Sequence, residues 1–359
     1  MACELHSRPS RMRSTSSDST NLDLLRSIAV LCVVANHLWD TAMGKTGRMG
    51  SDISWHIGQL GVSMFFVHTA LVLMWSLERQ KETGVSMFRV FYIRRLFRIY
   101  PLSIFCVLFV FLVLPEHWAV PTLLANLSLT QNLVYKPDMI YVLWSLPLEV
   151  QMYLLLPFIF LFCRPRPLLW VFVIWVASIP LALAQHALCP RFDVFSYAPN
   201  FLGGIIAWKL LRGRVKQLSA WLWIPAIPLV STVWLVSSRQ HNMWYRWAFG
   251  LALGLAIPFF ADISWHWLRR TAQTIAKYSY GIYLTHTTIL WFAFTYLASH
   301  NRTVQWTALI LLLAAVPVIV YHTIEAPMVA LGKRWSKVRR APASAPKTIT
   351  IEDACLVPE

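Results

Sequence analysis

The chain repeats one feature along its length, a stretch of mostly apolar residues about 20 long, which is the length a helix needs to cross a bilayer. In hydrocarbon every backbone polar group must find its partner within the protein, so such stretches are expected to be helices. The sequence therefore predicts an all-α fold, a polytopic transmembrane helical bundle of about ten spans. The predicted spans are 23–43, 57–77, 99–115, 141–162, 168–186, 195–211, 218–237, 243–261, 279–298 and 304–330.

The composition agrees with a membrane protein. Only 13% of the residues are charged and 57% are hydrophobic, whereas soluble domains carry about 25% charged residues. The charges are also unbalanced, with a formal net charge of +16. A water-soluble nucleic-acid-binding protein can be as basic as this but not as apolar. We therefore expect the lipid bilayer as a partner and no nucleic acid.

The surplus of positive charge predicts the orientation of the chain, because Lys and Arg gather in cytoplasmic loops. If both termini are cytoplasmic, most of the 32 Lys and Arg residues fall on the inner side. Counting 116–140 as a further span would invert every later loop and remove this bias. Because Pro121, Asn126 and Asp138 interrupt that stretch, we interpret it as a loop or re-entrant segment. The outer side then holds only Lys45, Arg48, Lys136, Arg191, Arg239, Arg246 and Arg302.

The chain is expected to have three parts. Residues 1–22 are predicted to be a disordered basic tail, 23–335 the membrane domain and 336–359 a flexible cytoplasmic tail. The six cysteines show no CxxC spacing. Neither a metal site nor a disulfide is therefore expected.

Ionisable side chains are few in the predicted spans, and each is a candidate functional group because burying charge in a membrane is costly. In the first span, Arg26 and His37 are eleven residues apart, about 1,100° of helical rotation, and so share one face. Asp40, three residues further, can reach His37 and orient its ring. The plainer alternative is a histidine that hydrogen-bonds a neighbouring helix, with Arg26 extending to the interface.

A second group of charges, Arg94, Arg95 and Arg98, lies among aromatic residues at the start of the third span. Guanidinium groups match phosphate oxygens, so these arginines are candidates for a phosphate clamp. They are equally candidates for an ordinary anchor to phospholipid head groups. Their spacing alone does not separate the two interpretations.

The other candidates are polar residues within apolar spans. A carboxylate such as that of Glu149 must be neutral, paired or beside a polar cavity, and Tyr153 shares its helical face. Tyr283 and His286 are three residues apart and therefore neighbours on a helix. Glu325, near the end of the last span, is expected either to pair with an arginine or to take part in chemistry.

In their order along the chain, these elements resemble the integral-membrane acyltransferase-3 family over about residues 21–335. The resemblance implies O-acyl transfer from acyl-CoA, reached from the cytoplasm, to a hydroxyl that often belongs to an envelope glycan. It also implies that Arg26, His37, Arg95 and Arg98 are needed for activity. The elements are LDLLRSIAVLCVVANH, GVSMFFVHTALVL, RRLFRIYP, LWSLPLEVQMYLLLPFI, YSYGIYLTH and IEAP.

The chain departs from the family pattern at two places. Members usually have Ser-Gly after the Phe-Phe pair of the second span, where this chain has His68 and Thr69. They usually have a small polar residue in the fourth span where this chain has Pro147. Both departures concern the shape of the acyl-donor pocket.

The mechanism that we expect places the coenzyme A phosphates at the arginine cluster, with the acyl-pantetheine arm running between the helices. His37, oriented by Asp40, acts as a general base on the acceptor hydroxyl or carries the acyl group covalently. Acyl-CoA, acetyl-CoA in first place, is a co-substrate, and no bound cofactor or metal is expected. The residues assigned are, for catalysis, His37, Arg26, Asp40 and Glu149; for the donor, Arg94, Arg95 and Arg98; and for substrate contact, Tyr153, Tyr283, His286, Glu325 and His68.

Several acceptors and functions stay open at this point. The acceptor is a cell-envelope glycan or a lipid-linked sugar, or alternatively a secondary metabolite such as a macrolide. Scattered intramembrane His, Glu and Arg are also typical of a proton-coupled transporter, although the chain shows no inverted repeat. A non-catalytic membrane scaffold would not need Arg26 and His37 on one face. In each case we expect a multi-pass protein of the bacterial inner membrane.

Overall fold

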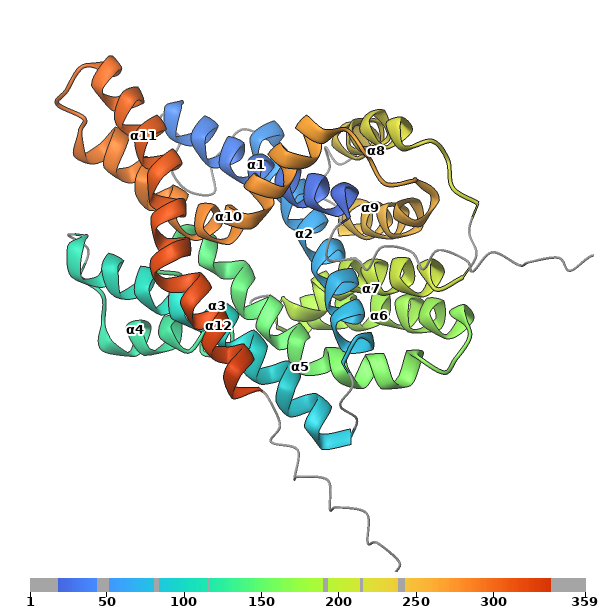
Figure 1. Cartoon of the computed structure of the whole chain (residues 1–359). Coiled ribbons are helices and arrows are strands. Elements are labelled where there is room, and N and C mark those ends of the chain that lie inside the picture. Colours follow the sequence, from blue (N-terminus) through green and yellow to red (C-terminus); the bar gives the residue numbers. More distant parts are fainter. Residues whose placement is uncertain are drawn as a thin grey trace, which may run out of the picture.

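The computed structural model describes residues 19–43, 52–80, 84–114, 117–189, 193–213, 216–237 and 243–336. Within these ranges the chain is helical and forms no β-strand, so the predicted all-α class is confirmed (Figure 1). The helices are α1 (Thr20–Ala42), α2 (Asp52–Glu78), α3 (Gly84–Val113), α4 (Val120–Leu127), α5 (Ser145–Cys163), α6 (Leu168–Leu188), α7 (Val194–Leu211), α8 (Trp223–Ser237), α9 (Met243–Ala256), α10 (His266–Trp291), α11 (Arg302–Val320) and α12 (Ala326–Trp335).

Six helical segments of the described chain are long and apolar enough to cross a membrane. This confirms a multi-pass membrane protein, while the count of ten spans and the cytoplasmic position of both termini stay predictions. The other predicted spans form α7, α8, α9 and α10, which are shorter or more polar. The six segments are Thr20–Ala42, Ser54–Glu78, Gly84–Val113, Tyr141–Cys163, Leu168–Gln185 and Arg302–Trp335.

Helix α1 begins at Thr20, so residues 20–22 belong to the helix and not to the predicted tail. A contact from a distant part of the chain explains this start. The carboxylate of Asp262 accepts hydrogen bonds from the backbone N–H groups of Thr20 and Asn21, at 3.3 and 3.0 Å. It thus satisfies donors that have no partner within the helix. The rest of the two predicted tails, 1–18 and 337–359, lies outside the described residues.

Helix α3 begins at Gly84, well before the predicted start at 99. Its arginine-rich turns escape a search for apolar length, but buried Met87, Val90 and Phe91 give them an inward face. The cluster from Arg94 to Arg98 therefore projects from a regular helix. Consecutive side chains on a helix point about 100° apart, so Arg94 and Arg95 point in different directions.

The segment 117–140 is not a span, in agreement with the prediction of a loop or re-entrant segment. It contains the short helix α4 and then a loop held by side-chain hydrogen bonds. The amide of Asn126 donates to the carbonyls of Thr122 and Pro137, both at 2.9 Å, and accepts from the backbone N–H of Met139 at 3.0 Å. These bonds supply partners for backbone groups that no regular helix satisfies.

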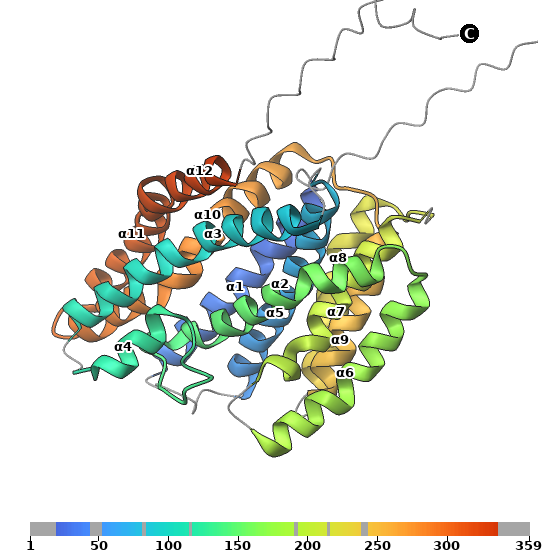
Figure 2. The same ribbon diagram turned by 90° about the horizontal axis from the view of Figure 1, so that it is seen from below.

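Close contacts at glycine hold the centre of the bundle together. A Cβ on Gly203 of α7 would meet the backbone oxygen of Gly250 in α9, and one on Gly204 would meet that of Val67 in α2. Small residues allow such an approach of helix backbones, which is a common device in membrane bundles. Figure 2 shows α7 and α9 side by side.

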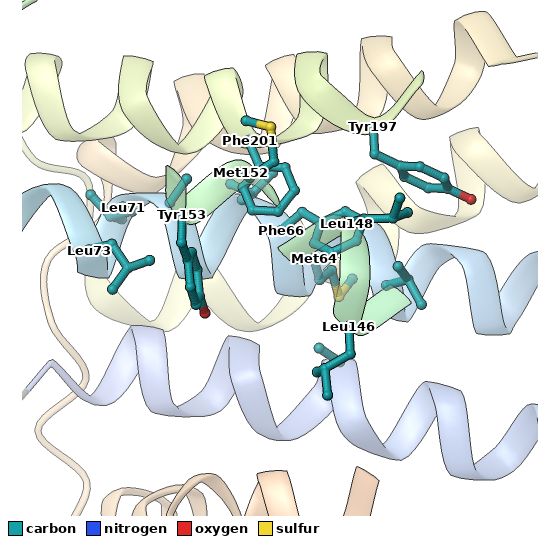
Figure 3. Close-up of a cluster of buried hydrophobic side chains, with 14 of the residues drawn as sticks. Met64, Phe66, Leu71, Leu73, Leu146, Leu148, Met152, Tyr153, Tyr197 and Phe201 are labelled. Carbon is teal, nitrogen blue, oxygen red and sulfur yellow. The ribbon is translucent and has the colours of Figure 1, made fainter. Parts of the chain in front are cut away.

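Apolar side chains from α2, α5 and α7 fill the space beside the candidate site (Figure 3). Phe66 stacks on Phe201 with ring centroids 4.5 Å apart. Met64, Leu148 and Met152 around them are almost fully buried. This packing holds α2 and α5 in place, and these two helices carry polar residues of the site.

Helices α11 and α12 form one continuous segment that is interrupted by a π-helical turn at Tyr321–Glu325. Pro327 follows the turn and lacks a backbone N–H, which removes one helical hydrogen bond there. The turn places Glu325 inside the protein, where it is only 2% exposed. Such π-helical turns occur frequently at functional sites.

Candidate functional site

A polar cavity of about 90 Å³ lies in the middle of the bundle, between α1, α2, α3, α5 and α10. This volume has room for several water molecules, each of which needs about 10–15 Å³ measured in the same way. Seven of the sequence-predicted site residues meet in its wall. They are Arg26, His68, Arg95, Arg98, Glu149, Tyr153 and Tyr283.

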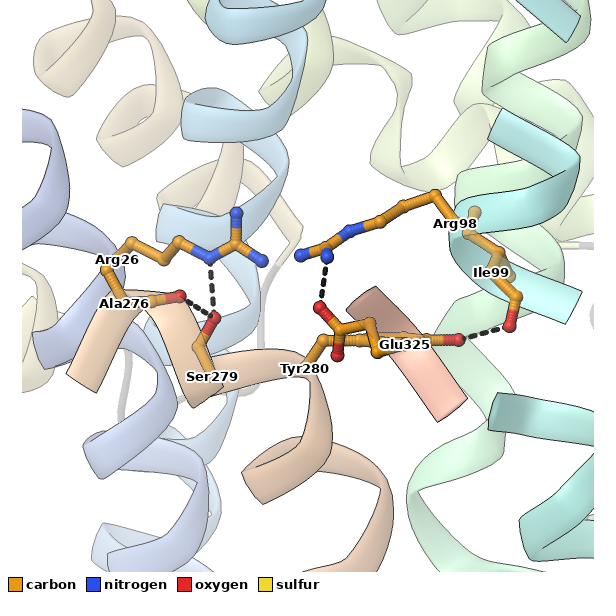
Figure 4. Close-up of polar contacts among 7 residues, drawn as sticks. All are labelled: Arg26, Arg98, Ile99, Ala276, Ser279, Tyr280 and Glu325. Atoms are coloured by element: carbon orange, nitrogen blue, oxygen red, sulfur yellow. Dashed lines mark hydrogen bonds and ion pairs between the residues drawn. The ribbon is translucent and has the colours of Figure 1, made fainter. Parts of the chain in front are cut away.

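Arg26 is held in the cavity by α10. Its Nε donates to the hydroxyl of Ser279 at 2.6 Å, and that hydroxyl donates in turn to the carbonyl of Ala276 at 2.8 Å. Figure 4 shows the guanidinium groups of Arg26 and Arg98 pointing toward one another. Two like charges that face each other across a cavity favour an anion between them.

Arg98 forms an ion pair with Glu325 across α3 and the π-helical turn (Figure 4). Its guanidinium also lies over the ring of Tyr280, 5.7 Å from the centroid. The Tyr280 hydroxyl donates to the carbonyl of Ile99 at 2.7 Å and so joins α10 to α3. The predicted pairing of Glu325 with an arginine is therefore confirmed.

The carboxylate of Glu149 accepts a hydrogen bond from the hydroxyl of Tyr153, one turn further along α5. Both residues line the cavity together with Arg95. Arg94, in contrast, donates from its Nε to the hydroxyl of Ser336 at 3.0 Å, at the end of α12. Of the three predicted clamp arginines, Arg95 and Arg98 line the cavity together with Arg26, and Arg94 does not.

Several buried polar atoms around the cavity have no partner in the part of the chain that the structure describes. They are Nδ1 of His68, Nε of Arg95 and Oε2 of Glu325. A buried polar group without a hydrogen bond costs about 1–3 kcal/mol. Two of these atoms, on His68 and Arg95, belong to residues that line the cavity, so they are available to polar groups that enter it, whether water or a ligand.

His37 lies outside this cavity, in a second cluster of the site. Its ring is 5.0 Å from that of Tyr141, edge to face, and 5.3 Å from that of His286. The Nδ1 of His286 donates to the carbonyl of Ile282 at 3.0 Å, so its Nε2 is the acceptor nitrogen when the ring is neutral. That Nε2 is buried and has no partner among the described residues.

The structure gives the carboxylate of Asp40 partners other than His37. Asp40 accepts hydrogen bonds from the hydroxyl of Ser54 at 2.5 Å and from the amide of Asn36 at 3.0 Å. The spacing of three residues would allow contact with His37, but α2 places Ser54 beside the carboxylate. Asp40 therefore joins α1 to α2.

Tyr283 separates the polar cavity from the two histidines. Its hydroxyl donates to the carbonyl of Val142 at 2.6 Å and accepts from the hydroxyl of Ser145, also at 2.6 Å. Its ring centroid is 6.2 Å from that of His286. Tyr283 thus closes the cavity on the side of the histidine pair.

Sequence reasoning missed Ser145, Ser279 and Tyr141. A serine in an apolar span gives no signal of its own, since its partner comes from another helix. Tyr141 lies at the end of the polar loop, where an aromatic residue is usual in membrane proteins. Among the residues described, no group of three His, Cys, Asp or Glu side chains is close enough to hold a metal ion.

Comparison with models of protein families matches residues 19–323 to a family described as an acyltransferase domain. The match extends from the start of α1 into the π-helical turn before α12, and so includes the helices that form the cavity and the histidine pair. No curated protein and no solved structure matches the chain.

Proposed function

Because the chain belongs to the acyltransferase-3 family, and is therefore a membrane acyltransferase, we propose that it moves an acyl group, acetyl in first place, from acyl-CoA to a hydroxyl of a cell-envelope glycan or a lipid-linked sugar. The observation that carries the donor side of this proposal is the pair of guanidinium groups, Arg26 and Arg98, that face each other across the cavity. With Arg95 they offer a fork of donors suited to a phosphate group of the donor.

The layout of α1 supports transfer between two separate places. Arg26 lies in the cavity and His37 in the histidine cluster, about 16 Å further along the helix. A donor whose phosphate is held by the arginines has a flexible pantetheine arm, which has to pass Tyr283 to reach the histidine pair. Its thioester then approaches His37 from the cavity side.

In the proposed chemistry, His37 takes the proton from the acceptor hydroxyl as the oxygen attacks the thioester carbonyl. The carbon–sulfur bond breaks, and coenzyme A leaves as a thiolate that takes up the proton. General-base catalysis of this kind contributes about 10²–10⁴ in rate. In the covalent variant the His37 ring attacks the thioester first, and the carbon–sulfur bond breaks as coenzyme A leaves as a thiolate that takes up the ring N–H proton. The acyl-imidazole then passes its acyl group to the acceptor hydroxyl, whose proton returns to the His37 ring.

The test uses the purified full chain in proteoliposomes, with acetyl-CoA and a sugar acceptor, and follows both free thiol and acylated sugar. His37→Ala should lower kcat by about 10²–10⁴. Arg95→Lys should raise the KM for acetyl-CoA, because lysine cannot make a two-pronged contact with phosphate. The matched variant Arg94→Lys should change the KM little, since Arg94 lies outside the cavity.

Retained acyl transfer by His37→Ala would overturn both the base and the covalent mechanism. Solute transport without thioester cleavage in the same vesicles would favour a transporter instead. Mass spectrometry of the protein after incubation with acetyl-CoA alone separates the two mechanisms. An acetyl group on His37 supports the covalent one, and an unmodified His37 in a preparation that is active when the acceptor is added supports the general base.

A further inference from the structure

A second hollow of about 320 Å³ lies apart from the polar cavity, between α3, α10 and α11. Its walls include Phe105 and Phe109 of α3, Ile289 of α10, and Leu312 and Val316 of α11. No charged side chain lines it. The hydroxyl of Thr285 at its edge already donates to the carbonyl of Gly281, at 2.8 Å. The surface that this groove presents is therefore hydrocarbon.

The groove results from the way α3 meets the long C-terminal helical segment. The two pack closely at α12, where a Cβ on Gly332 would collide with the side chain of Phe97. They part toward α11, and α10 lies between them (Figure 1). A small separate apolar cluster, which includes Ile289 and Leu309, joins α10 to α11 at this end.

The surroundings of the groove indicate what enters it. Helix α3 and the segment Arg302–Trp335 are both among the candidate membrane spans. Phe105 and Phe109 at the groove are 44% and 42% exposed, so it opens sideways from the bundle. In a membrane that side faces lipid, and an apolar groove there is filled by a hydrocarbon chain.

The floor of the groove is the helix that carries the candidate site. Leu284 and Thr285 line the groove, and Tyr283 and His286 flank them in the sequence. A hydrocarbon chain in the groove is therefore about one helix diameter, some 10 Å, from the histidine pair. The polar cavity offers no comparable room for a chain, since it is smaller and lined by charged groups.

We propose that this groove binds the hydrocarbon chain of the acceptor, so that the acceptor is a lipid-linked sugar rather than a free glycan. This inference rests on the proposed acyl transfer. The hydrocarbon chain of the acceptor gains little hydrophobic free energy when it moves from the bilayer into the groove. Binding of the hydrocarbon chain holds the attached sugar near His37. The sugar hydroxyl is then present at the site at a high effective concentration.

The test compares acetyl transfer to methyl, octyl and dodecyl glycosides of one sugar, with the full chain in phosphatidylcholine nanodiscs. The dodecyl glycoside should be acylated about tenfold or more faster than the methyl glycoside at equal concentration, because its chain anchors it. Leu312→Trp should fill the groove and reduce this ratio to near one. Leu311→Trp is the matched control, because Leu311 is 62% exposed and does not line the groove.

A binding measurement makes the result independent of turnover. A dodecyl glycoside with a photoreactive diazirine in its chain should label peptides of α3, α10 and α11. Unlabelled dodecyl glycoside should compete, and Leu312→Trp but not Leu311→Trp should reduce the labelling. If a diazirine phosphatidylcholine labels the same peptides equally and dodecyl glycoside does not compete, the groove holds bulk lipid and the inference is overturned.

Two further outcomes would also overturn it. One is equal acylation of all three glycosides together with equal effects of the two tryptophan variants. The other is a change of oligomeric state in Leu312→Trp, measured by native mass spectrometry, which would show that a second copy of the chain covers the groove. Failure of the proposed acyl transfer is a different result, since no glycoside would then be acylated even where the groove is labelled.

Discussion

The imidazole rings of His37 and His286 lie 5.3 Å apart, although they belong to α1 and α10. His286 is completely buried, and its Nδ1–H is fixed by the carbonyl of Ile282. Its Nε2 is therefore held as an acceptor beside His37. The two histidines form one unit, set apart from the arginines by the Tyr283 ring.

Replacement of His286 by Gln should lower kcat by about 10²-fold, the smaller end of the range for loss of an acid–base group. The KM for acetyl-CoA should stay near its original value, because the polar cavity, where we propose that the donor binds, lies on the other side of Tyr283. Steady-state acetyl transfer measures both constants. His322→Gln is the control, since His322 is exposed and does not line the cavity. Equal losses in the two variants would contradict a specific role for His286.

The ion pair of Arg98 and Glu325 gives a second prediction. Arg98→Met should reduce the free energy of unfolding by about 3–5 kcal/mol, because it leaves a buried carboxylate without its partner. Adding Glu325→Leu should restore most of this loss, since the double variant buries no unpaired charge. Denaturant unfolding in detergent micelles measures the difference.

The same double variant should remain inactive, because Arg98 also lines the polar cavity. Recovery of stability without recovery of activity would separate the structural contribution of Arg98 from its role toward the ligand. A double variant as unstable as Arg98→Met would contradict the prediction.

Some of the site follows directly from the sequence. The shared face of Arg26 and His37 is a consequence of helical periodicity, and the structure places both on the inner side of α1. The pairing of Glu325 with an arginine also follows, because a carboxylate in an apolar span needs a partner. The long apolar stretches are sufficient to predict helices, and the polar residues of 116–140 to predict an interruption.

Other parts of the site depend on contacts between distant segments. Arg26 and His37 share a face but serve different clusters, because Ser279 and His286 of α10 meet them at different heights. The separation of Arg94 from Arg95 requires knowing that α3 is helical before residue 99. The contact of Asp40 with Ser54 depends on how α2 packs on α1, which no local pattern reveals.

This contact leads to a third prediction. Asp40→Asn weakens the hydrogen bond from Ser54 that joins α2 to α1, and also the bond from Asn36 within α1. Hydrogen bonds to charged groups contribute about 1.5–3 kcal/mol each. The variant should therefore lower the melting temperature, while kcat per folded molecule stays close to that of the original protein. Thermal unfolding and single-turnover transfer on the same preparation check this. A large loss of kcat with unchanged stability would instead restore the link from Asp40 to His37.

The glycine contacts between α7 and α9 give a fourth prediction. A Cβ at Gly254 would collide with the backbone carbonyl of Gly203, so Gly254→Ala should cost about 1–3 kcal/mol through overpacking. Ala248→Val is the matched control, because Ala248 is exposed on the same helix. Unfolding in detergent compares the two. Equal stabilities would mean that the two helices can separate without cost.

The π-helical turn at Tyr321–Glu325 sets the angular phase between the two ends of a 34-residue helical segment. Before the turn, Leu312 and Val316 face the apolar groove. After it, Gly332 faces Phe97. Removing one residue from the turn would rotate everything beyond it by about 100°. A single insertion or deletion in the turn would therefore keep the contacts of one end of the segment and break those of the other. Only a compensating pair of changes would preserve both.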